Sequence, residues 1–107
     1  MSESECVMKN EKIKSLDELA DIIQALKRDG NIVVQCHGVF DLLHPGHILH
    51  FEAAKREGDI LVVTVTRDEH VDKGPGRPVF NQRIRTESIA ALQCVDYVAL
   101  NEWPTAV

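Results

Sequence analysis

Apolar and polar residues follow two different rhythms along the chain, one helical and one typical of buried strands. Ser15 followed by Glu18 predicts a helix start with a capping box, and Asp29-Gly30 predicts the end of that helix. Between these signals, the apolar residues that share one helical face are Leu16, Leu19, Ile22, Ile23 and Leu26. The spacing therefore predicts a first helix between Ser15 and Asp29-Gly30.

Two short runs rich in β-branched residues, NIVVQC (31–36) and DILVVTVT (59–66), lack polar alternation. Such runs are typical of parallel strands covered on both faces, so we expect both to be central rather than edge strands. VDYVAL (95–100) predicts a third strand. Helical spacing lies between the strands: residues 45–57 predict a second helix and residues 81–92 a third.

The resulting order is helix, strand, helix, strand, helix, strand. Alternation of this kind implies a parallel sheet joined by right-handed crossovers. The sequence therefore predicts an α/β fold, a Rossmann-like parallel sheet with flanking helices, which corresponds to the first half of a doubly wound nucleotide-binding fold. Ligands of such open sheets bind at the carboxyl ends of the strands.

The stretch GVFDLLHPGH (38–47) joins the end of the first strand to the start of the second helix. With His44 as the N-cap, Pro45 occupies the first helical position, where its missing N–H is no loss, and His47 occupies the third. The two imidazoles then share one face of the first turn. Gly46 is expected to let a ligand approach the backbone, whose free N–H groups favour an anion. The stretch therefore predicts a phosphate-binding site.

The interaction energies of the available donors indicate why histidines would be added to a helix terminus. The terminus alone is worth about 0.3 to 1 kcal/mol to a nearby negative charge. A preorganised donor aimed at charge that develops in a transition state contributes on the order of 3 to 4 kcal/mol. In nucleotidyl transfer the attacking phosphate is already ionised, so the protein has to align groups and neutralise charge rather than supply a nucleophile. Two histidines without an adjacent nucleophilic side chain fit that requirement.

Composition limits the partners. The 107 residues are 44% apolar and 27% charged with a net charge of -5, which argues against sequence-independent nucleic-acid binding. No apolar run approaches the ~20 residues of a membrane helix, and the first ten residues do not resemble a signal peptide, so we expect a cytoplasmic protein without membrane contact. Cys6, Cys36 and Cys94 form no C-x-x-C pair and are expected to be reduced.

Positive charge that could hold an anionic ligand is concentrated in KGPGR (73–77) and in Arg83 and Arg85. The loop could also serve only turn geometry, and the arginines could form ion pairs on a helix face. Three further histidines and one tryptophan are open to a second interpretation. His50 suggests a zinc site with His44 and His47, but no further ligand is evident; structural roles are favoured for His37 and His70, and packing rather than base stacking for Trp103.

GVFDLLHPGH resembles the H-x-G-H motif of the cytidylyltransferase-like nucleotidyltransferases, which include glycerol-3-phosphate cytidylyltransferase. GDILVVTVTRDEHVDKGPGRPVF and ALQCVDYVALNEWPTA are most similar to the adenylyltransferase domain of the ADP-heptose synthase type. The resemblance covers residues 13–107, which we expect to form one nucleotide-binding domain after a flexible segment of residues 1–12.

The resemblance implies roles for individual residues. His44 and His47 would contact the triphosphate and stabilise the pentacoordinate phosphorus, Lys73 would contact phosphate, and Arg85 would match an arginine that opens the third helix and belongs to the catalytic set. Asp41 would hold the loop. The implied nucleotide-binding positions are Gly38, Val39, Phe40, Asp41, His44, Gly46 and His47. Magnesium would be carried on the nucleotide phosphates, with no dedicated protein ligands.

The activity that the resemblance implies is transfer of AMP or CMP from ATP or CTP to a phosphorylated sugar or polyol, preferably a sugar 1-phosphate of the heptose type, with release of pyrophosphate. A glycerol-3-phosphate cytidylyltransferase-like activity and a non-catalytic nucleotide-binding module are the alternatives. The HPGH motif also resembles that of class I aminoacyl-tRNA synthetases, but the chain is too short, lacks a KMSKS-like loop and is acidic.

Family members continue past the third strand with two further strands, so the resemblance predicts a fold truncated after that strand. The first strand normally pairs with the fourth, and its apolar edge would be exposed here. A fragment of a longer enzyme, a homodimer that completes the domain, or a fused kinase domain are the expected consequences.

Overall fold

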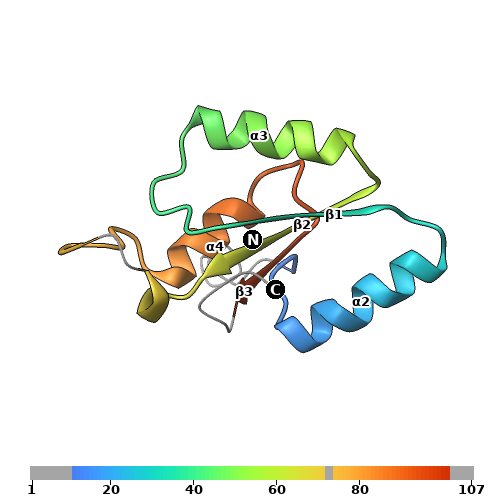
Figure 1. Cartoon of the computed structure of the whole chain (residues 1–107), viewed down its shortest axis with the longest axis horizontal. Coiled ribbons are helices and arrows are strands. Elements are labelled where there is room, and N and C mark those ends of the chain that lie inside the picture. Colours follow the sequence, from blue (N-terminus) through green and yellow to red (C-terminus); the bar gives the residue numbers. More distant parts are fainter. Residues whose placement is uncertain (1–10, 72–73, 102–107) are drawn as a thin grey trace, which may run out of the picture.

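The computed structural model describes residues 11–71 and 74–101, and its elements follow the predicted alternation (Figure 1). In chain order they are α2 (Leu16–Arg28), β1 (Val33–Gly38), α3 (Pro45–Arg56), β2 (Ile60–Thr66), the 3₁₀ turn η1 (Asp68–His70), α4 (Gln82–Ala90) and β3 (Tyr97–Asn101). Ser15 caps α2, and the Ser15–Glu18 capping box is present as predicted. The 3₁₀ turn after β2 was not predicted.

The three strands form a parallel sheet in the order β1-β2-β3. The expectation that β1 is central is wrong, because in the described part of the chain β1 pairs with β2 alone. β2 is the central strand, and six of its seven residues are buried, whereas one of six is buried in β1. A β-branched run indicates a buried strand, but it does not say how many strands lie beside it.

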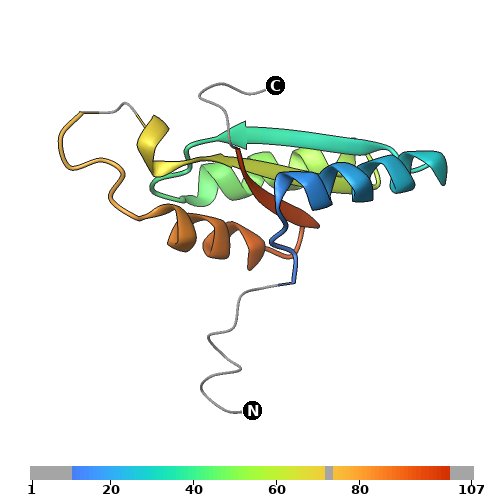
Figure 2. The same ribbon diagram turned by 90° about the horizontal axis from the view of Figure 1, so that it is seen from below.

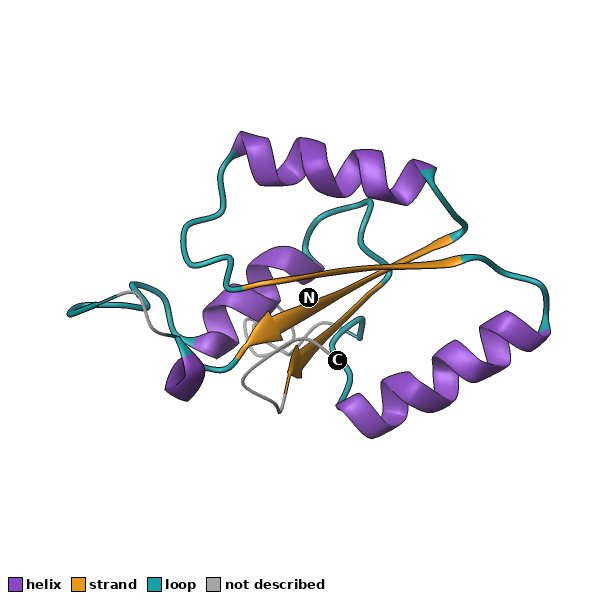
Figure 3. Ribbon diagram, viewed as in Figure 1, coloured by secondary structure: helices purple, strands orange, loops and turns teal. Residues whose placement is uncertain are grey.

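Helices cover both faces of the sheet, as the lack of polar alternation predicts. α2 lies on one side and α3 on the other (Figure 2). The core under α3 and α4 includes Phe51, Val63, Ile89 and Val98, and a smaller cluster under α2 is built on Leu19, Val62 and Ala99. The chain therefore has a Rossmann-like α/β fold (Figure 3).

The expected flexible segment, residues 1–12, lies outside the described residues except for its last two. Lys12 is part of the fold, because its carbonyl accepts the backbone N–H of Val98 at 2.9 Å. Ile13 forms an isolated parallel bridge with the same residue. Lys12 and Ile13 thus belong to the domain and lie beside β3.

Candidate active site

The candidate site lies where β1 ends and α3 begins, at the carboxyl edge of the parallel sheet (Figure 1). His44 is the N-cap of α3, and Pro45 occupies the first turn, as the sequence predicts. The backbone N–H of Gly46 donates to Nδ1 of His44 at 3.0 Å. The backbone N–H of His44 donates to Nδ1 of His47 at 3.2 Å. The two imidazoles therefore cap the helix and lie against each other, with ring centroids 4.0 Å apart.

These two bonds determine which ring nitrogen carries the proton. A nitrogen that accepts a backbone N–H has no hydrogen of its own, so each neutral imidazole carries its proton on Nε2. In each ring the N–H therefore lies on the nitrogen that takes no part in capping, and by type it is a hydrogen-bond donor. The capping arrangement thus fixes both the orientation and the tautomer of His44 and His47.

The aromatic ring of Phe40 packs against the imidazole of His47. Its ring makes edge contacts with His47, at a centroid distance of 5.7 Å, and with the buried Phe51, at 5.1 Å. Phe40 has a φ of 52°, an uncommon conformation for a residue with a side chain. Gly38 admits this arrangement, because a Cβ there would lie 2.8 Å from the Phe40 ring. Phe40 therefore contacts His47 directly, and Gly38 leaves the space that the Phe40 ring occupies.

The structural reason for a glycine at position 46 differs from the expected one, which was close approach of a ligand to the backbone. A Cβ at Gly46 would lie 2.6 Å from Cε1 of His44, so the glycine makes room for the imidazole rather than for an approaching ligand. The backbone N–H groups expected to be free are also engaged: Gly46 donates to His44 Nδ1, and the amides of His47 and Ile48 donate to the His44 carbonyl. Donors for an anion therefore come from side chains at this terminus.

Asp41 holds two segments together. Its side chain is buried, and its carboxylate accepts the backbone N–H of Phe80 and a guanidinium N–H of Arg77, both at 3.0 Å. Burial by itself would raise the pKa of this carboxyl, but bonds from the Val79 and Phe80 amides and the Arg77 charge outweigh it and lower the pKa to about 2. Asp41 is thus ionised and ties segment 77–80 to the loop after β1.

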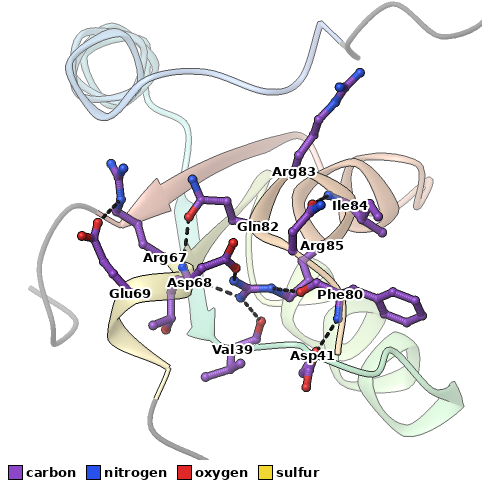
Figure 4. Close-up of polar contacts among 12 residues, drawn as sticks. Val39, Asp41, Arg67, Asp68, Glu69, Phe80, Gln82, Arg83, Ile84 and Arg85 are labelled. Atoms are coloured by element: carbon purple, nitrogen blue, oxygen red, sulfur yellow. Dashed lines mark hydrogen bonds and ion pairs between the residues drawn. The ribbon is translucent and has the colours of Figure 1, made fainter. Parts of the chain in front are cut away.

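Arg85 is a completely buried cation (Figure 4). Its guanidinium donates to the carbonyls of Phe80 at 3.0 Å, Val39 at 2.8 Å and Thr66 at 2.7 Å, and to the Asp68 carboxylate. These four bonds use four of its five N–H groups. The structure therefore does not bring Arg85 to a surface that a phosphate could reach, and it places Val39, whose backbone was expected to seat the nucleotide, as a partner of Arg85.

Sequence reasoning missed the partners of Arg85. Three of the four are backbone oxygens, which leave no mark in a sequence, and Asp68 lies in a turn that no periodicity indicates. Asp68 is also bonded to α4, because its backbone N–H donates to Oε1 of Gln82 at 3.0 Å (Figure 4). The buried arginine therefore joins the ends of β1 and β2 to the start of α4.

The other predicted residues have partners outside the histidine pair or lie outside the described residues. Lys73 and Trp103 belong to the latter. Arg83 is exposed and pairs with Glu87 one turn along α4. His50 points its Nε2 toward Sγ of Cys36, 3.8 Å away. Within residues 11–71 and 74–101, no three His, Cys, Asp or Glu side chains gather in a group that could hold a metal ion.

A cavity of about 290 Å³ opens beside His47 and is lined by Phe40, Asp41, Leu42, His47 and Arg77. A second cavity, of about 200 Å³, lies between α2 and the sheet. Among the described residues that line the second one, the polar members are Gln35, Thr64 and Asn101 and none is charged. Of these two cavities, the one beside His47 is therefore the better match for a phosphate-bearing ligand.

In this parallel sheet, the carboxyl end of β1 leads into α3, whose N-terminus is capped by two imidazoles. This fold and this site are those of a nucleotidyltransferase-like domain. The sequence profile of the cytidylyltransferase-like family matches residues 35–105. The chain belongs to this family.

Two similar proteins are each named bifunctional protein HldE. The one from Trichlorobacter lovleyi is 44% identical over 96 residues, covering 88% of this chain and 20% of its own length. The one from Geobacter metallireducens is 45% identical over 91 residues, covering 83% of this chain and 19% of its own length. The chain thus spans about a fifth of the length of these relatives.

A solved structure resembles the fold. The crystal structure of the lipopolysaccharide core biosynthesis protein from Thermoplasma volcanium superposes with a TM-score of 0.61 at 40% identity, over 68% of this chain and 60% of that one. Within residues 11–71 and 74–101, no helix combines the length and the apolar character that crossing a membrane requires.

Proposed function

We propose that the chain is a nucleotidyltransferase that moves AMP from ATP to the phosphate of a sugar 1-phosphate and releases pyrophosphate. The observation that carries the proposal is the pair of imidazoles at the N-terminus of α3, each held through Nδ1 by a backbone N–H. Both rings then present an Nε2–H donor, which is what a pair of phosphate oxygens that gain charge requires.

The reaction is one displacement at the α-phosphorus. An oxygen of the acceptor phosphate forms the new bond, and the bond from the α-phosphorus to the bridging oxygen of the β-phosphate breaks, so that pyrophosphate leaves. The nucleotide enters as its magnesium complex, and the ion belongs to the substrate. His44 and His47 donate to oxygens on which charge increases, and each such donor is worth roughly 10² to 10³ in rate.

Direct attack by the acceptor is favoured over a covalent enzyme intermediate because the described thiols are poor nucleophiles. Burial, followed by the charge of Cys94, raises the pKa of Cys36, and burial is also the main cause that raises the pKa of Cys94. Protonated thiols do not attack phosphorus efficiently. The acceptor phosphate is already ionised and needs no such help.

The choice of ATP follows the resemblance to the adenylyltransferase domain of the ADP-heptose synthase type. The name lipopolysaccharide core biosynthesis protein belongs to the similar solved structure, and it supports a carbohydrate acceptor here. We further propose that this domain works beside a kinase domain of the same polypeptide, which the word bifunctional in the relatives' names supports. Lys73 remains a proposed phosphate ligand from the family resemblance.

The test is pyrophosphate release by the purified, folded chain with ATP or CTP, magnesium, and either sugar 1-phosphates or glycerol 3-phosphate. Release with ATP and a sugar 1-phosphate is the expected result. Release only with CTP and glycerol 3-phosphate would replace the proposed substrates. A chain that binds nucleotide but releases no pyrophosphate with any pair would contradict the catalytic proposal and leave a nucleotide-binding module.

A further inference from the structure

The cavity beside His47 contains a second nitrogen donor that the histidine motif does not supply. Arg77 lines the cavity from the segment between η1 and α4, whereas His47 lines it from α3. Two donor groups from separate elements therefore face one space of about 290 Å³.

Arg77 is anchored rather than loosely placed. One of its guanidinium nitrogens, Nη1, donates to Oδ2 of Asp41 at 3.0 Å. The Asp41 side chain is 4% exposed, whereas that of Arg77 is 38% exposed, so the carboxylate lies inside and the guanidinium extends toward solvent. The bond occupies one of five N–H groups. Four guanidinium N–H groups are not used by this bond, and the residue that carries them lines the cavity.

The anchor itself is fixed. The other carboxylate oxygen of Asp41, Oδ1, accepts the backbone N–H of Phe80 at 3.0 Å. The carbonyl of Phe80 also accepts a hydrogen bond from the buried Arg85, so Phe80 joins the segment that carries Arg77 both to the loop after β1 and to α4. Arg77 thus has a defined position relative to His47 before any ligand binds.

The positive charge of Arg77 indicates that its ligand is an anion. The proposed reaction brings a phosphate dianion up to a triphosphate, and the chain as a whole carries -5. Among the described residues that line the cavity, Arg77 is the only lysine or arginine. Arg85 does not contribute there, because its bonds go to protein oxygens. A guanidinium can hold a phosphate through two parallel N–H bonds, which orients as well as neutralises it.

We propose that Arg77 binds the phosphate of the acceptor substrate and positions it for attack, while His44 and His47 serve the nucleotide. This inference rests on the proposed function. In-line displacement places the attacking and leaving oxygens on opposite sides of the phosphorus. Donors from two separate segments, one at the start of α3 and one before α4, suit two phosphate groups better than one.

Steady-state kinetics with each substrate varied in turn test the proposal in Arg77→Gln, Arg77→Lys and Arg83→Gln variants. Arg83 is the matched control, because it lies near Arg77 in sequence, is exposed and pairs only with Glu87 among its described contacts. The expected result for Arg77→Gln is a KM for the acceptor that rises on the order of 10- to 100-fold, with the KM for nucleotide changed less than about twofold. Lysine in its place should recover part of the loss.

Equal rises in both KM values, or no change in either, would overturn the assignment of Arg77 to the acceptor. A structural role for Arg77 would lower the stability of the fold without separating the two KM values, so unfolding midpoints are measured in parallel. Asp41→Asn weakens the anchor and should shift the acceptor KM in the same direction by a smaller factor.

Failure of the proposed function is distinguished by a binding measurement that needs no turnover. Inorganic phosphate is titrated into the purified chain by calorimetry. Weaker phosphate binding in Arg77→Gln, with Arg83→Gln unchanged, supports the Arg77 site even if no pyrophosphate is released with any substrate pair. Identical phosphate binding in all variants, or none in the unsubstituted chain, contradicts it.

Discussion

The backbone N–H of His44 donates to Nδ1 of His47, so one histidine of the pair sets the proton position of the other. The Gly46 amide does the same for His44. We therefore predict that the neutral form of each ring is the Nε2–H tautomer. Ring ¹⁵N chemical shifts in two-dimensional NMR spectra check this directly, and a protonated Nδ1 on either neutral ring would contradict it.

The same geometry predicts how strongly different substitutions of His44 and His47 lower the turnover rate. His44→Ala or His47→Ala should lower turnover roughly 10²- to 10³-fold, because each removes a preorganised donor. Glutamine places an amide nitrogen near the position of Nε2, so His→Gln should retain more activity than His→Ala. The rate of pyrophosphate release measures both. Equal losses for glutamine and alanine would show that Nε2–H is not the group that matters.

Gly46→Ala should lower turnover by about 10² through His44, because the new Cβ would stand 2.6 Å from its ring and displace it. The control is the same substitution in a His44→Ala background. There, no imidazole remains to be displaced, so adding Gly46→Ala should change the rate little. Additive losses in the double variant would instead indicate that a ligand approaches the Gly46 backbone.

Arg85→Ala should lower the free energy of unfolding by on the order of 3 to 5 kcal/mol, as expected when a buried ion with several hydrogen-bonded partners is removed. Three carbonyls lose their partner at once. Arg83→Ala is the matched control on the same helix and should change stability by less than about 0.5 kcal/mol, because its pair with Glu87 is exposed. Urea unfolding of both variants measures the difference.

Asp41 should make stability fall in acid. Its pKa in the folded chain is about 2, below the ordinary value of 3.8, so the unfolded chain takes up the proton first. The stabilisation is complete above about pH 4 to 5 and is lost as the pH falls through the window from about 4 to about 2. Asp41→Asn should flatten this part of the curve. The exposed Asp17→Asn variant on α2 shows the background slope, and a slope unchanged in Asp41→Asn would contradict the assignment.

The sequence was sufficient where local signals determine structure. Pro45 and Gly58 bracket α3, and His44 is the N-cap that the stretch predicts. It was insufficient where distant segments meet. The burial of Arg85 depends on carbonyls from Val39 and Thr66, and carbonyls are the same in every sequence. The position of β1 at the edge of the sheet follows from strand order, which the composition of a strand does not encode.

Both α2 and α3 begin with reciprocal caps, but the residues differ: Ser15 and Glu18 in α2, His44 and His47 in α3. Serine is among the best N-caps, and a glutamate in the first turn also favours the helix dipole, whereas imidazole offers neither advantage. If the proposed function holds, selection for thermal stability and selection for catalysis therefore act in opposite directions at these two positions. In a library of this domain selected only for stability, His44 and His47 should drift toward serine and glutamate, and activity should be lost there while the fold improves.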